Sequence, residues 1–201
     1  MDAVRANLFS DASKANNSRW RVWYSTVAAT TVAQLGISAI TSITPVLSGG
    51  KYFGTVVLTD ANHMDGVCLR IGDKVNLICT GADAPFSAGD DANPCTVVDV
   101  IAGTSIKVNL PSSSYTGTAS SGTLVLRNPV RKAIFAGFKR TAQTANTSAY
   151  VIGPDATLTL PITVATSGTQ TVEEPAGSSF FLSDWSYKLG TINDVVLVTY
   201  K

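Results

Sequence analysis

The sequence predicts an all-β protein: a small antiparallel β-barrel or sandwich, followed by a second β-sandwich or jelly-roll-like module, with an extended N-terminal arm. Val and Thr are abundant, and their branched Cβ atoms fit a pleated strand better than a helix. The only glutamates are Glu173 and Glu174, so good helix formers are scarce. Short apolar runs alternate with Gly, Pro, Asn and Asp, which are turn residues.

The charge balance limits the kinds of partner. A net charge of +1 with 45% hydrophobic residues argues against a protein that coats nucleic acid and against a disordered tail. No run approaches the roughly 20 apolar residues of a membrane span. Residues Met1–Ser10 lack the apolar core of a secretory signal. We therefore expect a protein made in a cytoplasm, without nucleic-acid or membrane partners.

Residues 1–50 are predicted to form the N-terminal arm and a connecting segment. Met1–Asn17 is polar, with too little apolar surface to become ordered alone. In Arg19–Tyr24, strand alternation places three side chains on each face. From Ser25 to Gly50 the helix and strand interpretations compete.

Residues 51–129 are predicted to form the barrel or compact sandwich. Gly103 lies in a short connection that suits a tight hairpin, while Gly81–Pro94 is predicted to be a long loop. Closure into a barrel removes exposed sheet edges. The expected strands of this module are Tyr52–Thr59, Lys74–Thr80, Thr96–Ile101, Ser105–Leu110 and Thr123–Arg127.

Residues 130–201 are predicted to form the second β module, although the two halves could also merge into one continuous sandwich. Gly-Pro, Ser-Gly and Pro-Ala-Gly turns separate its strand-like runs. These runs are Val130–Arg140, Ala149–Ile152, Thr157–Val164, Phe180–Leu182 and Val195–Tyr200.

The sequence contains no pattern typical of an enzyme. His63 is the only histidine. It is either a polar loop residue or a base that activates Cys68. No nucleophile-elbow signature accompanies it, which favours the loop residue. Adjacent acids such as Glu173–Glu174 and Asp90–Asp91 point to opposite faces of a strand, so neither pair converges on one bond. We expect no catalytic residues.

No cofactor or metal is expected either. Cys68, Cys79 and Cys95 lack the spacing of zinc knuckles. The aspartates of the 81–94 loop lack the alternating pattern and closing Glu of a calcium loop.

Two aromatic clusters are the candidate protein-binding residues. Trp, Tyr and Arg are enriched at interface hot spots, and an extended segment can add a strand to a neighbouring sheet. The alternative is that both clusters belong to the core, where large aromatics are mostly found. The candidate interface residues are Arg19, Trp20, Arg21, Trp23, Tyr24, Trp185 and Tyr187.

Four segments carry a resemblance to a known group of proteins: Leu69–Leu77, Val97–Leu110, Phe181–Lys188 and Val195–Tyr200. Together with the polar arm, the Ser/Thr/Gly-rich β modules and the low charge, they resemble minor structural proteins of tailed bacteriophages. The resemblance implies a virion protein that acts as capsid cement or decoration. It would bind the major capsid protein and other virion subunits, form a homo-oligomer and lack enzymatic residues.

Two alternatives remain open. The same kind of protein could serve as a neck or tail adaptor, where head-to-tail interfaces close into rings. A different class is a glycan-binding β module, in which Trp185 and Tyr187, or Trp20 and Trp23, form an exposed stacking platform.

Overall fold

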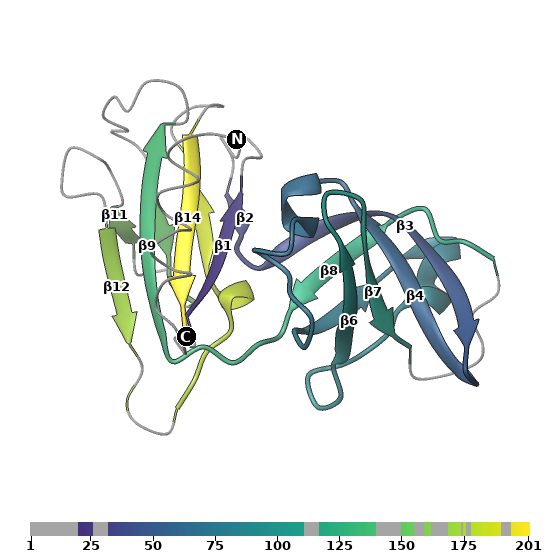
Figure 1. The fold of residues 1–201 in the computed structure, drawn as a ribbon. Helices are drawn as coiled ribbons and strands as arrows, with labels where there is room; N and C mark the ends of the chain where they lie inside the picture. Colours follow the sequence, from purple (N-terminus) through teal and green to yellow (C-terminus); the bar gives the residue numbers. More distant parts are fainter. Residues whose placement is uncertain are drawn as a thin grey trace.

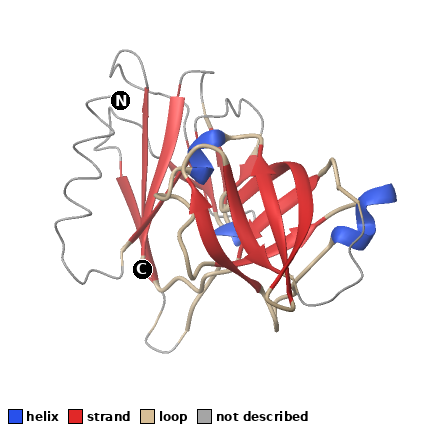
Figure 2. Ribbon diagram, turned by 45° about the vertical axis from the view of Figure 1, so that its right-hand side comes forward, coloured by secondary structure: helices blue, strands red, loops and turns tan. Residues whose placement is uncertain are grey.

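The computed structural model describes residues 20–25, 32–110, 117–139, 150–154, 159–161, 169–173, 175, 178–189 and 194–201. Strands dominate, and the helices are short (Figures 1 and 2). The predicted all-β class is therefore confirmed. Within the described residues, no helix is long and apolar enough to cross a membrane.

Six strands form a closed antiparallel barrel in the order β3-β4-β7-β6-β5-β8. Alternate positions point inward, so side chains such as Val56, Val97 and Leu124 are fully buried. The small antiparallel barrel is thus confirmed, and residues 37–48 of the ambiguous segment form a strand. The six strands are β3 (Ile37–Ser48), β4 (Lys51–Leu58), β5 (Lys74–Ile78), β6 (Cys95–Ile101), β7 (Ser105–Asn109) and β8 (Gly122–Leu126).

Short 3-10 helices fill several connections. Helix η1 (Ala61–Met64) begins after Asp60, whose carboxylate accepts a hydrogen bond from the N–H of Asn62. Helix η2 (Gly81–Phe86) occupies part of the predicted long loop, and η4 (Leu182–Asp184) precedes β13.

The other strands form two four-stranded antiparallel sheets, with orders β1-β14-β9-β12 and β11-β10-β13-β2. The rings of Phe135 on β9 and Trp185 beside β13 lie 5.3 Å apart between centroids, and both are buried, so the two sheets share a core. The strand orders do not confirm a jelly roll. The strands are β1 (Arg21–Ser25), β2 (Ala33–Gln34), β9 (Lys132–Lys139), β10 (Tyr150–Ile152), β11 (Thr159–Pro161), β12 (Thr169–Glu173), β13 (Ser186–Lys188) and β14 (Asp194–Tyr200).

The barrel is inserted into the two-sheet unit. Strand β1 pairs with β14, with Arg21 opposite Tyr200, and β2 pairs with β13, with Ala33 opposite Tyr187. Strands β3–β8 lie between β2 and β9 in the chain, and Figure 1 shows them as a separate body beside the sheets. This organisation differs from the predicted division at residues 51 and 129.

The predicted N-terminal arm also differs from the structure at its C-terminal end. Residues 20–25 do not extend away from the body; they form or adjoin the edge strand β1, while residues 1–19 lie outside the described part. The predicted strand Phe180–Leu182 is wrong, since Phe180 makes one isolated bridge to Val130 and Leu182 begins η4.

Candidate functional site at the junction of barrel and sheets

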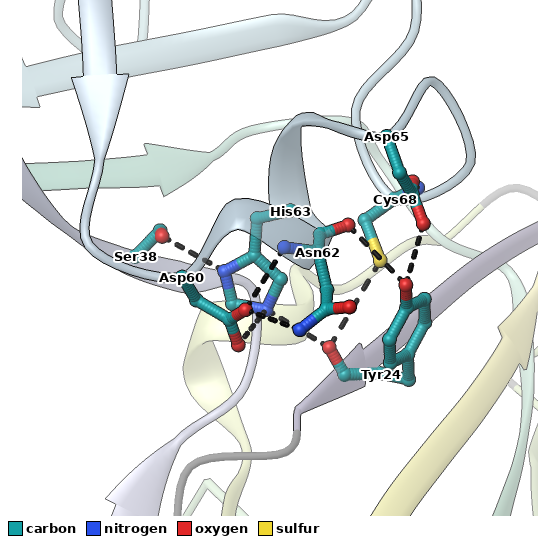
Figure 3. Close-up of polar contacts among 7 residues, drawn as sticks. All are labelled: Tyr24, Ser38, Asp60, Asn62, His63, Asp65 and Cys68. Atoms are coloured by element: carbon teal, nitrogen blue, oxygen red, sulfur yellow. Dashed lines mark hydrogen bonds and ion pairs between the residues drawn. The ribbon is translucent and has the colours of Figure 1, made fainter. Parts of the chain in front are cut away.

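A group of polar side chains lies where β1 meets η1 of the barrel. We call it the junction cluster, and Figure 3 shows that its members converge from β1, β3, η1 and the turn after η1. The cluster consists of Tyr24, Ser38, Asp60, Asn62, His63, Asp65 and Cys68.

His63 is the centre of this cluster. Its Nε2 lies 2.9 Å from the carbonyl oxygen of Tyr24, and its Nδ1 lies 2.8 Å from the hydroxyl of Ser38. A carbonyl only accepts, so Nε2 carries the proton and Nδ1 accepts from Ser38. The imidazole also packs on the indole of Trp23, with centroids 4.3 Å apart. The geometry defines a neutral histidine in one tautomer.

Burial lowers the pKa of His63 below its ordinary value, and this effect outweighs three opposing ones. Asp60, the Tyr24 carbonyl and Asp65 each favour the charged form. The Asp60 carboxylate lies 3.7 Å from Nε2, beyond hydrogen-bond range. At neutral pH the imidazole is therefore uncharged and serves as a polar link between the barrel and β1.

Asp65 makes a second link to β1. The Tyr24 hydroxyl donates to Asp65 Oδ2 at 2.5 Å, while Asp65 Oδ1 accepts from the backbone N–H groups of Val67 and Cys68. The same carboxylate thus shapes the turn after η1 and holds the side chain of a strand in the other unit.

An ion pair with a buried carboxylate lies at the opposite end of β1. The guanidinium of Arg21 contacts Asp73 Oδ1 at 2.5 Å, and the Asp73 side chain is completely buried. The amide of Asn128 donates to the same oxygen, and the N–H of Arg70 donates to Oδ2. Asp73 therefore joins the barrel, the connection after β8 and the first sheet.

The cluster does not have the geometry of a catalytic triad. In a triad the serine bonds one imidazole nitrogen and a carboxylate orients the other. Here Ser38 and a backbone carbonyl occupy both nitrogens of His63, so neither is available to Cys68 as a base. Ser38 is also only 4% exposed. The arrangement fits a structural role for these residues.

The candidate metal-binding residues are engaged by the protein itself. Cys68, Cys79 and Cys95 are buried thiols. Asp83 accepts hydrogen bonds from Ser120 and Ser121, and Asp91 pairs with Arg127. Across the described ranges, no group of three or more His, Cys, Asp or Glu side chains is placed to hold a metal ion.

The structure places most of the candidate interface residues in the core. Trp23, Tyr24, Trp185 and Tyr187 are at most 5% exposed. Trp20 and Arg21 are half-buried, with the Lys201 ammonium 5.2 Å from the Trp20 ring centroid. Arg19 lies outside the described residues. In this conformation the buried side chains present no surface to a partner. An interface role of Trp23 and Tyr24 stays a prediction that requires β1 to become accessible, and one of Trp185 and Tyr187 requires the same of the segment from Trp185 to β13.

Sequence reasoning missed Ser38, Asp73 and Asn128. The turns Asp65-Gly66 and Gly72-Asp73 were visible as turns, but nothing in a turn motif reveals which distant strand its carboxylate will meet.

No protein-family model, curated protein or solved structure matches this chain.

Proposed function

We propose that this protein is a structural subunit of a tailed-phage particle, which binds neighbouring capsid subunits and stabilises the shell as a cement or decoration protein. The observation that supports this best is the role of the polar side chains between the two β units. His63 and Asp65 of the junction cluster, together with Asp73, contact β1 and hold the two units together. A body braced in this way acts through its surface.

The β3–β4 hairpin is the surface best suited to such binding. Its tip points away from the sheets in Figure 1. Leu47 near the tip is 61% exposed and stands opposite the partly buried Tyr52. A scattered exposed Leu is ordinary on a protein surface, but a projecting hairpin with neighbouring apolar side chains offers an anchor for a pocket in a partner.

The position in the particle separates the cement role from a neck or tail adaptor. A cement subunit is expected in hundreds of copies, and a neck protein in a closed ring of few copies. Mass-spectrometric copy number in purified particles distinguishes them, and sedimentation of the purified protein shows whether it forms rings.

A glycan-binding role receives less support. A stacking platform needs exposed rings, and Trp23, Trp185 and Tyr187 are buried. We therefore place this alternative behind the structural role.

The direct test is binding of the purified protein to particles that lack it. We expect saturable binding and a rise in the temperature at which the particles open, because a ligand of the assembled state stabilises that state. Leu47→Asp should weaken binding, whereas Ile101→Asp, at a similarly exposed position on the barrel, is the matched control. Failure of the unaltered protein to bind any such particle contradicts the proposed function.

The arm needs a separate test. Deleting residues 1–24 would also remove most of β1, so loss of binding would not separate an arm from a damaged sheet. Deleting residues 1–19 keeps β1 intact. Unchanged affinity of that variant would contradict a binding role for the arm.

A further inference from the structure

The barrel joins the two-sheet unit through two chain crossings that lie side by side. Gly36 precedes β3, and its carbonyl accepts a hydrogen bond of 2.7 Å from the N–H of Leu126, at the end of β8. The next residues pair directly, with Ile37 opposite Val125. Gly36 has a φ of +65°, a conformation natural to glycine. Two adjacent crossings of this kind would define one axis, as in a hinge, if the two units turned relative to each other.

The ion pair between Arg21 and Asp73 lies close to this hinge. Asn128, which follows β8, bonds Asp73, and the N–H of Arg127 bonds the carbonyl of Lys74. These contacts fix the pivot. Helix η1 contacts Trp23 and Tyr24 towards the other end of β1. This contact holds the barrel against the sheet at that end.

We infer that the contact between η1 and β1 is an acid-sensitive latch, in which proton uptake by His63 loosens the barrel from β1 and uncovers Trp23 and Tyr24. The uncovered residues are two of those whose chemistry predicted an interface. The latch thus connects the closed structure with the binding role that the sequence suggested for this strand.

The geometry shows what a second proton on His63 would disturb. Nδ1 would become a donor facing the Ser38 hydroxyl, which now donates to it. That hydroxyl would have to turn towards another acceptor in a site where Ser38 is 4% exposed and His63 is 3% exposed. A charge without its hydration is costly there.

The groups that face His63 determine the balance between its charged and its neutral form. From the barrel these are Asp60 and Asp65, which favour the charge. From β1 they are the Trp23 ring and the Tyr24 carbonyl, and the cation of that strand, Arg21, is already paired with Asp73. Burial outweighs the two carboxylates and lowers the pKa of His63. A state with the latch open binds the proton more readily, so acid favours opening.

The direction of the pKa shift of His63 defines the pH range over which the latch opens. Above the ordinary histidine pKa of about 6.5 both states are neutral, and the latch keeps its full stability. As the pH falls below that value, the open state is protonated first, and closure is progressively lost until the pH passes the lowered pKa of the closed state.

Hydrogen exchange of the full chain, corrected for intrinsic rates, tests the latch. Between pH 7.5 and about pH 5, peptides covering β1 and η1 should exchange progressively faster as the pH falls. Peptides covering β6 and β7 in the barrel should keep their protection. Unchanged exchange in β1 and η1, or simultaneous loss of protection everywhere, would overturn the inference.

Because the chain has one histidine, a single imidazole C2–H resonance reports its titration by NMR. Its midpoint should lie below that of an unfolded control in urea. His63→Gln stays neutral at all these pH values and should abolish the acid-induced exchange; persistence of the response in this variant would also overturn the inference.

A second variant covers the case in which His63→Gln fails to fold. Ser38→Ala removes the donor to Nδ1 that favours the neutral imidazole. It should raise the titration midpoint and, because the closed-state pKa then moves closer to the ordinary histidine value, shift the lower limit of the pH range upward and reduce the acid-induced gain in exchange. A shift of one without the other would contradict the proposed link.

Discussion

Arg21 and Asp73 form an ion pair across the boundary between the two β units. The carboxylate is completely buried, and the guanidinium Nη2 lies 2.5 Å from it. Asn128 donates to the same oxygen at 2.8 Å. The pair therefore belongs to a small network, and loss of the guanidinium would leave the buried carboxylate without its charged partner.

The first prediction concerns this network. Asp73→Ala should lower the free energy of unfolding by about 3 kcal/mol, because it removes the buried acceptor shared by Arg21, Asn128 and the N–H of Arg70. Urea denaturation measures the change. The control is Glu173→Ala, which removes the exposed partner of Lys132 and should cost no more than about 1 kcal/mol. Equal effects of the two substitutions would contradict the role assigned to Asp73.

The second prediction concerns Trp185, which contacts the rings of Phe135 and Phe180. Trp185→Ala should destabilise the protein by about 3–5 kcal/mol through the cavity it leaves. Thermal denaturation and glycan-array binding should be measured together. Loss of glycan binding without loss of stability would favour the glycan-binding alternative and contradict the core role.

The third prediction concerns Cys95, whose pKa is raised to about 11 by burial. Only the thiolate reacts rapidly with alkylating reagents, so at pH 8 the folded protein should protect Cys95 from iodoacetamide. Mass spectrometry should show modification of the Cys95 peptide only when the protein is unfolded in urea. Rapid labelling under native conditions would show that the thiol is neither buried nor protonated as described.

The fourth prediction compares two glycines with positive φ. A Cβ on Gly89 would lie 2.8 Å from the backbone nitrogen of Cys95, whereas a Cβ on Gly103 would meet nothing within 4 Å. Gly103→Ala should cost about 1–2 kcal/mol from the left-handed backbone alone. Gly89→Ala carries the same strain and a backbone clash, so it should cost more. Denaturant midpoints of the two variants measure the difference, and equal midpoints would contradict it.

The fifth prediction follows from the insertion of the barrel. A fragment of residues 36–128 begins and ends at adjacent points, as Gly36 and Leu126 are hydrogen-bonded, and it contains all six barrel strands. It should fold alone, with lower stability because the contacts of Asp73 and His63 with β1 are missing. Strand-type circular dichroism with a cooperative thermal transition would confirm this, and a disordered spectrum would contradict it.

The barrel was predictable because its signals are local. The β6–β7 hairpin follows from alternating residues on either side of Ala102-Gly103-Thr104, and Val75 and Leu77 on β5 are buried as their alternation predicts. Sequence neighbours supply three of the six pairings, β3-β4, β5-β6 and β6-β7. The other three, β4-β7, β5-β8 and β3-β8, join strands that are apart in the chain, so the turns alone do not determine them.

The partners of β1 and β2 were not predictable in the same way. Alternation identifies a strand but not the strand it pairs with, and the partners of β1 and β2 lie at the far end of the chain. Side chains on both faces of β1 are buried, because η1 covers the face of the strand that would otherwise be exposed. Strand β13 has three residues, too few to show a period, and β12 was missed among polar residues.

The pairing of Arg21 with Tyr200 also imposes an order on biosynthesis. All six barrel strands have left the ribosome well before β14 does, so the barrel can close while β1 still lacks its neighbour. Until translation reaches that last strand, Val22, Trp23 and Tyr24 have no sheet to join. The nascent chain therefore carries a finished barrel next to an apolar, unpaired segment, which is the stage at which a chaperone would be most needed.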